Sequence, residues 1–257
     1  VLALTGTDLY RDIQTDAAAQ ASLAMASRII VLQELAPLGL EEAHRAKAEV
    51  IFQSTTSQPT LLKSAVHLRA VMVGHLRDEK SPETLFAAAR LLGNPDFDKL
   101  SPNGIYIDHI GAGLDPTLAK AAEATATACP NYRWLEAMPH EATRRAIGRA
   151  HVLVHTSKME GGAHVLMEAV CSGTPVIASR IDGNVGMLGA DYEGYFDWGD
   201  AAGLAGLLRE CRATQSDANG LLARLSKQCA VRAPLFAPLH ESAKLNALVD
   251  SLFLQQS

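Results

Sequence analysis

The sequence predicts an α/β protein built on doubly wound, parallel sheets. Three observations predict it: short apolar runs alternate with helical stretches from about residue 65, glycine-rich turns follow these runs, and 48% of the residues are hydrophobic. Single helices between strands lead to parallel pairing with right-handed crossovers. Ligands of such sheets bind beyond the carboxyl ends of the strands, so the glycine-rich turns are the first candidates for a site.

The elements can be assigned in order along the chain. The first part holds predicted strands at 1–4, 28–32 and 49–52 and a helix at 16–26, followed by a polar, linker-like stretch at 54–60. Beyond it, we expect strands at 65–73, 105–110, 132–135, 152–155, 174–179 and 195–198, and helices at 82–92, 116–129, 141–149, 162–172 and 200–211. Ser81 and Asp200 are suitable N-caps, and the helical tail from residue 219 is broken around Pro234 and Pro238. The chain opens on Val1 inside a strand-like run, without a Met, so we expect it to be incomplete at this end.

Composition narrows the function classes. The net charge of −5 argues against a nucleic-acid partner, which would require a basic surplus. No run of about 18 apolar residues indicates a membrane span, and no signal peptide is visible. The four cysteines show neither disulfide-framework nor zinc spacing, and no metal-ligand cluster is present. These features predict a cytoplasmic protein that needs neither a metal nor another cofactor; they leave its oligomeric state open.

The stretch from residue 152 to 179 carries the clearest chemical signal. It consists of a strand, a glycine-rich turn (Glu160, Gly161, Gly162), a helix that contains Glu168, and a Gly-Thr-Pro step into the next strand. The start of a helix offers free N–H groups and the positive end of a dipole, which suit a diphosphate. The helical residues from Gly162 to Glu168 span about 9 Å, so Glu160 in the turn and Glu168 in the helix could contact two parts of one elongated ligand.

This stretch resembles the donor-site signature of the large retaining glycosyltransferase family with the GT-B fold, in which two Rossmann-like domains face a cleft. The resemblance implies that Glu160 contacts the transferred sugar and that Glu168 binds the ribose of a UDP-sugar. It also implies three parts: residues 1–55 as the second half of an acceptor-side domain, 61–218 as the donor domain, and 219–257 as helices crossing back.

The same resemblance assigns the remaining site residues. Arg77 and Lys80 would neutralise the diphosphate leaving group, although His75 stands where the family usually has Arg. Thr5 stands where a cleft His is usual, which removes an acid/base group. The full assignment is catalytic Glu160, Lys80, Arg77, Thr5 and Asp8; donor-binding Gly74, His75, Gly111, Trp134, Leu135, Gly161, Gly162, Ala163, His164 and Glu168; and acceptor-binding Gly6, Thr7 and Arg11. Trp134 could equally be core, Arg77 and Lys80 a solvated turn, and Asp8 and Arg11 a helix cap and a surface charge.

Longer strings, such as those at 4–12, 73–82 and 159–164, resemble the selenosugar synthases of selenoneine biosynthesis. That resemblance implies transfer from UDP-N-acetylglucosamine or UDP-glucose to selenophosphate. Three alternatives stay open: a transferase with a hydroxyl acceptor such as a lipid, polysaccharide or small molecule, a UDP-sugar epimerase, and a nucleotide-sugar-binding module without catalysis.

Overall fold

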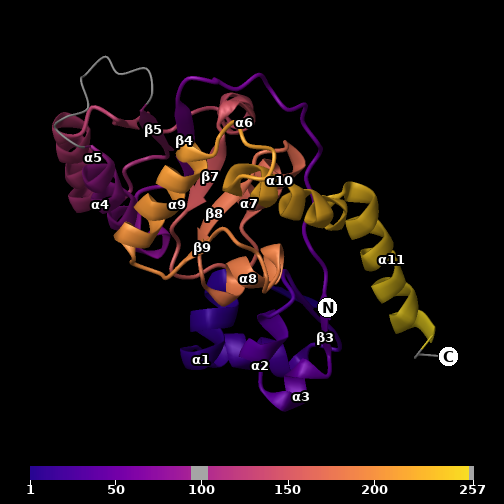
Figure 1. Ribbon diagram of the computed structural model, residues 1–257. Coiled ribbons are helices and arrows are strands. Elements are labelled where there is room, and N and C mark those ends of the chain that lie inside the picture. Colours follow the sequence, from indigo (N-terminus) through magenta and orange to yellow (C-terminus); the bar gives the residue numbers. More distant parts are fainter. Residues whose placement is uncertain (94–103, 255–257) are drawn as a thin grey trace.

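A computed structural model describes residues 1–93 and 104–254 and contains two parallel β-sheets (Figure 1). The smaller sheet has three strands in the order β1-β2-β3, and the larger has six in the order β6-β5-β4-β7-β8-β9. Every strand pair in both sheets is parallel. The predicted doubly wound α/β class is therefore confirmed.

The smaller sheet is formed by the first 50 residues. Its elements are β1 Leu2–Leu4, the π-helical turn Asp8–Asp12, α1 Ile13–Thr15, α2 Ala17–Met25, β2 Ile29–Val31, a 3₁₀ turn Ala36–Gly39, α3 Glu42–Arg45 and β3 Ala48–Val50. The Asp16 carboxylate caps α2 by accepting from the N–H groups of Ala18 and Ala19. A small apolar cluster around Leu9, Ile29 and Val31 holds these elements together.

The larger sheet occupies most of the remaining chain. Its strands are β4 Leu68–Val73, β5 Ile105–Ile110, β6 Tyr132–Trp134, β7 Val152–His155, β8 Val176–Ser179 and β9 Tyr195–Phe196. From β4 the chain proceeds outward to β6 and then returns to β7, on the other side of β4. The junction between β4 and β7 is thus the point where the strand order reverses, which is where such sheets bind ligands.

Helices cover both faces of the larger sheet. The helical elements of this part of the chain are the 3₁₀ turn Asp78–Lys80, α4 Pro82–Leu92, α5 Pro116–Ala128, α6 His140–Arg149, α7 His164–Cys171, α8 Asp182–Leu188, α9 Ala201–Ala213, α10 Leu221–Arg232, the 3₁₀ turn Ala233–Phe236 and α11 Pro238–Leu254, which extends away from the sheet. Helix α4 packs against α5 and α9, whereas α6 packs against α7. Right-handed crossovers on either side of β4 place these two groups on opposite faces.

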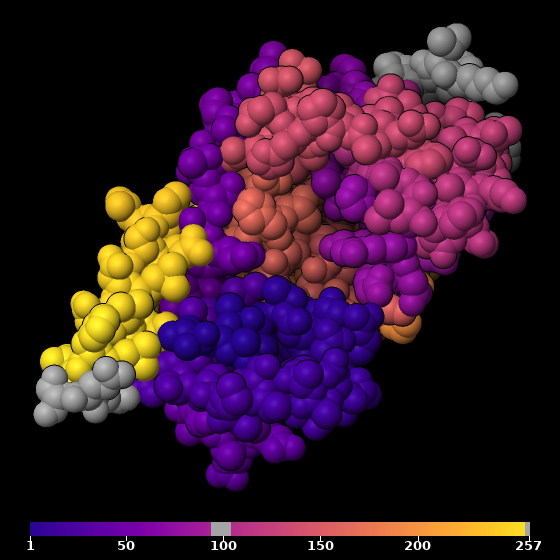
Figure 2. Space-filling model, turned by 180° about the vertical axis from the view of Figure 1, so that it is seen from behind, coloured from indigo at the N-terminus to yellow at the C-terminus, as the bar shows by residue number. Residues whose placement is uncertain are grey.

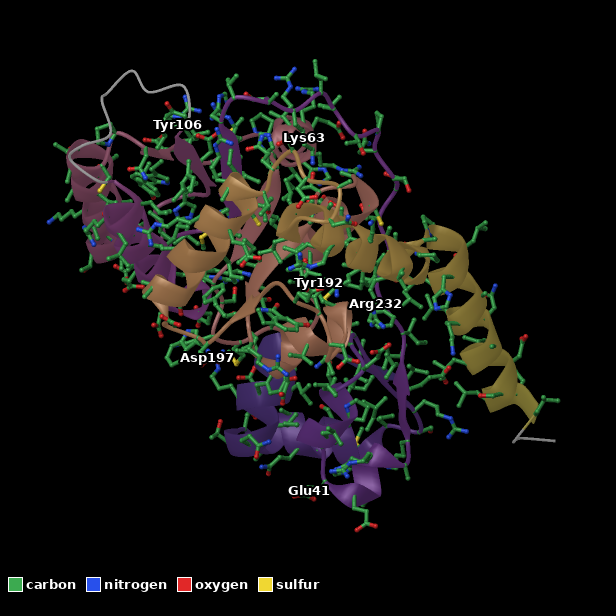
Figure 3. The ribbon with its side chains drawn as sticks, viewed as in Figure 1. Glu41, Lys63, Tyr106, Tyr192, Asp197 and Arg232 are labelled. Atoms are coloured by element: carbon green, nitrogen blue, oxygen red, sulfur yellow. The ribbon has the colours of Figure 1, made fainter. Side chains whose placement is uncertain are left out.

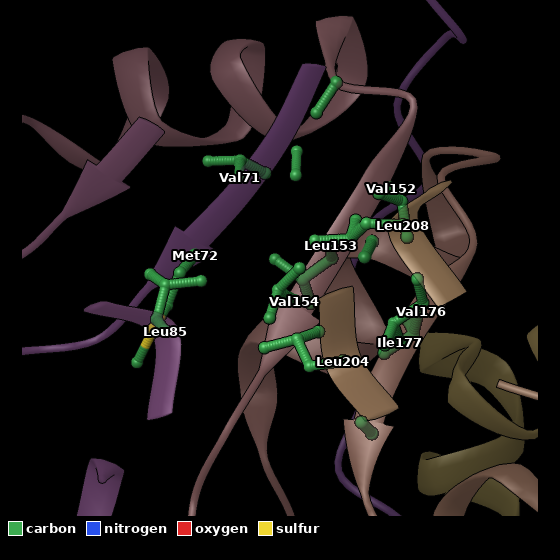
Figure 4. Packing of buried hydrophobic residues seen from close by; sticks show 14 of the residues in the cluster. Val71, Met72, Leu85, Val152, Leu153, Val154, Val176, Ile177, Leu204 and Leu208 are labelled. Carbon is green, nitrogen blue, oxygen red and sulfur yellow. The ribbon is translucent and has the colours of Figure 1, made fainter. Parts of the chain in front are cut away.

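The core lies between these layers and the sheet. All four residues of β7 and of β8 are buried, as expected for strands covered on both faces. Figure 4 shows Leu204 and Leu208 of α9 next to the side chains of Val154 and Leu153. Burial of these aliphatic side chains stabilises the sheet by roughly 1.5–3 kcal/mol for each fully buried residue.

Most predicted elements occur within a few residues of their expected bounds, with three corrections. The helix at 162–172 begins only at His164, because the glycines before it form a bend. Residues 182–188, for which no helix was predicted, form α8. Ser81 precedes α4 but makes no side-chain cap; its backbone is left-handed, with φ 43°, and its hydroxyl accepts a hydrogen bond from the indole of Trp198.

The polar stretch at 54–60 is attached to the larger sheet. Arg144 of α6 donates to the hydroxyl of Thr56, and the Thr60 hydroxyl donates to the carbonyl oxygen of Ser172 at 3.0 Å. The tail also contacts this region, since Phe52 and Phe236 make an edge-to-face ring contact with centroids 5.5 Å apart. In Figure 2 the indigo N-terminal residues lie against the rest of the molecule, and the yellow helix α11 extends along one side. None of the helices in the described ranges is long and apolar enough to cross a membrane.

Candidate active site

The turn after β4 is held in place by contacts with β5 and with the turn that follows β5. His109 on β5 contacts the carbonyl oxygen of Gly74 through Nε2 at 3.1 Å, and burial lowers the pKa of His109 to about 4, so the ring is neutral. A Cβ atom on Gly111 would lie 1.9 Å from that same carbonyl oxygen, so only glycine fits there. His75 Nδ1 accepts from the backbone N–H of Ala112 at 3.0 Å. The predicted donor-binding residues Gly74, His75 and Gly111 therefore form two turns in direct contact.

Lys80 and Glu160 meet across the junction of β4 and β7. Lys80 Nζ lies 2.5 Å from Glu160 Oε1, and the two side chains are only 16% and 13% exposed. The hydroxyl of Thr156, just after β7, donates to the carbonyl oxygen of Lys80 at 2.7 Å and ties the two turns together. Burial raises the pKa of Glu160, but His155 and the Lys80 ammonium group outweigh it and hold that pKa well below its usual value. The pair is thus a fixed, ionised unit.

His155 is the buried neighbour of this pair. Its Nε2 atom lies 3.4 Å from Glu160 Oε1, its side chain is 2% exposed, and its Nδ1 atom is buried without a hydrogen-bond partner among the described residues. It is the last residue of β7, so the strand itself positions it beneath the carboxylate.

Glu168 lies in α7, after the turn that contains Glu160, and its carboxylate has a separate set of partners. Its Oε1 atom lies 2.6 Å from His140 Nε2, 3.6 Å from His164 Nδ1 and 3.9 Å from Arg144 Nε. Burial raises the pKa of Glu168, but His164 and His140 outweigh this effect and lower it. The carboxylate is therefore ionised although the residue is only 5% exposed.

A cleft of about 330 Å³ lies between the two sheets, next to the Lys80–Glu160 pair. Its lining comes from both parts of the chain: Thr5, Gly6, Thr7, Arg11, Leu32, Gln53, Arg77, Glu79, Lys80, Met159, Glu160, Gly161 and Gly162. Arg77 is exposed, and no described residue forms a hydrogen bond or ion pair with its side chain. Arg11 lies 3.9 Å from Glu79 across the cleft. Three cations and two carboxylates therefore face one space.

A smaller, mostly apolar pocket of about 180 Å³ adjoins Lys80 on the other side. It lies beyond the ends of β4 and β5, and its lining residues are Val73, Gly74, His75, Lys80, Ile110, Gly111, Ala137, Met138 and Thr143. The described residues contain no group of three or more His, Cys, Asp or Glu side chains that could hold a metal ion.

Comparison with known proteins identifies the family. The model of the family "Glycosyl transferases group 1" matches residues 61–210, which is more than half of the chain. The chain belongs to the group 1 glycosyl transferases. The match covers both turns that carry Lys80 and Glu160, and it covers the helix that carries Glu168.

Solved structures show the same GT-B architecture. TarM from S. aureus, in a complex with fondaparinux, α-GlcNAc-glycerol and UDP, has a TM-score of 0.75 at 15% identity over 96% of this chain and 50% of its own. Anabaena HepE, in complex with UDP-glucose, has 0.72 at 15% identity over 96% and 71%. Sucrose-phosphate synthase from Thermosynechococcus elongatus has 0.71 at 20% identity over 97% and 66%. The chain thus spans about half of TarM and about two thirds of the synthase.

The glycines of the turn after β7 approach the smaller sheet. A Cβ atom on Gly161 would lie 2.2 Å from the backbone nitrogen of Gly6, and one on Gly162 would lie 2.7 Å from the Leu32 side chain. A Cβ on Gly183 of α8 would meet the carbonyl oxygen of Glu160 at 2.1 Å. These glycines therefore allow three backbone segments to pack together beside the cleft.

Some of the other predicted site residues line the cleft, and others do not. Thr5 and Thr7 line the cleft, whereas the Asp8 carboxylate accepts from the N–H and the hydroxyl of Thr5, both at 2.7 Å, in the manner of a local cap. Trp134 donates from its indole to the carbonyl oxygen of Gly111 at 2.8 Å, and Leu135 follows it at the end of β6. Neither Trp134 nor Leu135 lines the two pockets described above.

Ala163 and His164 form the start of α7. Ala163 is its N-cap and is buried, and His164 is its first residue and is half exposed. No described residue accepts a hydrogen bond from the backbone N–H of His164 or of Val165. Free amides of this kind are what a helix start offers to an anion.

Three residues of the centre were not predicted from the sequence. His140, Arg144 and His155 all contact one of the paired glutamates. His155 ends a strand of otherwise apolar residues, which could have marked it as a side chain directed at the site. The other two come from α6, more than twenty residues away in sequence from Glu168, and no local pattern connects them.

Proposed function

We propose that this chain is the part of a glycosyltransferase that binds the sugar donor, a UDP-sugar, and that its sugar is transferred to an acceptor in the cleft. The observation that carries the proposal is the Lys80–Glu160 ion pair at the strand-order reversal, with the start of α7 and Glu168 beside it. Structural neighbours support the choice of nucleotide, since TarM was solved with UDP and HepE with UDP-glucose.

The proposed donor pose gives a role to Lys80, Arg77 and both glutamates. The diphosphate lies at the start of α7, where free amides and the helix dipole favour negative charge. Lys80 and Arg77 stabilise the charge that develops on the leaving UDP as the bond to the anomeric carbon breaks. Glu160 contacts the sugar, Glu168 accepts from the ribose, and the apolar pocket beside Gly74 receives the base. Because cations and a helix end supply the charge, we expect no metal to be required.

For the acceptor, we propose selenophosphate. Arg11, Arg77 and Lys80 face the cleft, which suits an anionic acceptor. A hydroxyl acceptor needs a base, but no histidine is among the described residues that line this cleft, and the lowered pKa of Glu160 makes it a weak one. Selenophosphate arrives ionised, so its selenium lone pair can form the bond to the anomeric carbon while UDP leaves with the electrons of the broken C–O bond.

The test uses the full-length protein. UDP-N-acetylglucosamine or UDP-glucose is incubated with and without selenophosphate, and mass spectrometry follows UDP and a selenium-bearing sugar. We expect both products only when selenophosphate is present. Release of UDP with a hydroxyl acceptor alone would contradict the selenophosphate proposal but keep the transferase, and an epimer formed without acceptor would replace the transfer reaction. Absence of UDP-sugar binding would overturn the proposal as a whole.

A further inference from the structure

The carboxylate of Glu168 is held from one side only. His140, His164 and Arg144 all approach the same oxygen, Oε1. No described residue donates a hydrogen bond to Oε2. A buried carboxylate has about four acceptor positions, so half of its capacity is left for a ligand.

His140 makes the shortest of these contacts and comes from a different element. Its Nε2 atom is 2.6 Å from Oε1, and it is the first residue of α6, directly after the turn that contains Ala137 and Met138. Those two residues line the apolar pocket beside Gly74. His140 thus connects the wall of that pocket to the glutamate.

The surroundings argue against a purely structural contact. The His140 side chain is 65% exposed, so the fold does not need its ring for packing. Arg144, by contrast, is 7% exposed and also binds Thr56, which gives it a structural role. Because the His140 ring is exposed and Glu168 is only 5% exposed, the main effect of their contact is on the orientation of the Glu168 carboxylate.

We propose that His140 is a positioning residue for nucleotide binding: it fixes Glu168 through Oε1 and so leaves Oε2 oriented to accept from a ribose hydroxyl. This inference rests on the proposed function, because it assumes that the ligand carries a ribose. It gives the first residue of α6 a role in the donor site that is separate from the lining of the apolar pocket.

The test measures binding of UDP and of 2′,3′-dideoxy-UDP to the full-length protein by calorimetry. The wild type should prefer UDP by about ten- to a hundredfold, the range that a hydrogen bond to a charged group provides. Glu168→Ala should abolish most of this preference. His140→Ala should reduce it roughly three- to tenfold, as expected for coupled neighbours, and His140→Gln should restore part of it, because its amide can donate to Oε1. His240→Ala, a histidine of α11 outside the site, is the control and should change nothing.

Two results would overturn the inference. If His140→Ala weakens both nucleotides equally, His140 does not act through the ribose. If it changes neither affinity while Glu168→Ala abolishes the preference, Glu168 needs no positioning by His140. If Glu168→Ala itself leaves the preference intact, or the wild type binds neither nucleotide, the ribose role in the proposed function fails first and this inference with it.

Discussion

Lys80 and Glu160 form a contact that stabilises the fold and, under the proposed function, also takes part in the reaction. The two charges neutralise each other in a nearly buried place, which would be costly for either alone. A phosphate that arrives beside Lys80 would share its ammonium group without leaving Glu160 unpaired, because His155 stays within 3.4 Å of the carboxylate. Under the proposed function, we therefore expect donor binding to require little rearrangement of this pair.

Replacing Lys80 by Ala should lower kcat by about 100- to 1,000-fold, since a cation that meets charge on the leaving group acts mainly in the transition state. Steady-state kinetics with the UDP-sugar and its acceptor measure this. Lys80→Arg keeps the charge and should lose less. Lys120→Ala, on the exposed side of α5, is the matched control and should keep full activity. A kcat for Lys80→Ala within threefold of the wild type would contradict the role.

His164 should make stability depend on pH. The Glu168 carboxylate, 3.6 Å from its Nδ1 atom, raises the pKa of His164 against the opposing effect of burial. A raised pKa means stabilisation that is complete below about pH 6.5, the ordinary value, and is lost as the pH rises through the folded value. The lowered pKa of Glu168 acts oppositely: its contribution is present above its usual value of 4.5 and is lost as the pH falls through the folded value.

The raised pKa of His164 and the lowered pKa of Glu168 together place the largest contribution of this pair to stability between the two ordinary pKa values. Urea unfolding of the wild type and His164→Ala should therefore show a larger difference at about pH 5.5 than at about pH 8.5. His240→Ala should show no such trend. A difference that stays constant, or grows toward high pH, would mean that the pair is not ionic.

At the scale of elements, the sequence predicts the large sheet well and the small one less sharply. The strands at 105–110 and 152–155 consist mostly of apolar residues bounded by turns, and they were predicted to the residue. Strand β3 begins at Ala48 with only partly buried residues, so its apolar signal is weak and was placed slightly too late. Helix α8 contains two glycines, which mark a loop locally; the contacts of these glycines with Glu160 and Gln33 explain their presence in a helix.

The site, too, was predicted only in part from the sequence. Lys80, Glu160 and Glu168 lie in local motifs that the sequence displays, and their ionic partners on other elements become visible only in three dimensions. Gly161 and Gly162 were predicted to bind the donor. The structure adds the approach of Gly6 and Leu32, which depends on how the two sheets pack.

Gly161→Ala tests that packing. Its Cβ would meet backbone atoms of Gly6 and Thr5 at 2.2 and 2.6 Å, and backbone cannot move aside cheaply. We expect a loss of about 1–3 kcal/mol in the free energy of unfolding, as for other overpacked sites. Gly206→Ala is the control: nothing lies within 4 Å of the added Cβ in α9, so it should stabilise by about 0.5–1 kcal/mol. Equal effects of the two changes would show that the sheets do not meet at Gly161.

At the scale of the whole molecule, Arg232 connects three regions. It ends α10 and donates to the carbonyl oxygens of Met187 and Gly186 at the end of α8. It pairs with Glu34 of the N-terminal part at 2.9 Å and lies over the ring of Phe52. Figure 3 shows Arg232 near Tyr192, where α10 adjoins α8.

Arg232→Ala should therefore cost about 2 kcal/mol of stability, because two carbonyl groups lose a charged donor and a largely buried stem is removed. Chemical denaturation measures the loss, and limited proteolysis should show earlier cleavage within residues 1–50. Glu34→Ala removes only the exposed partner of a surface pair and should cost less than about 1 kcal/mol. Because Glu34 is the sole partner that Arg232 loses in that variant, the gap between the two values measures what α8 and Phe52 contribute. If the two variants are equally mild, the small sheet is held by its glycine contacts alone, and Arg232 does not join it to the rest of the molecule.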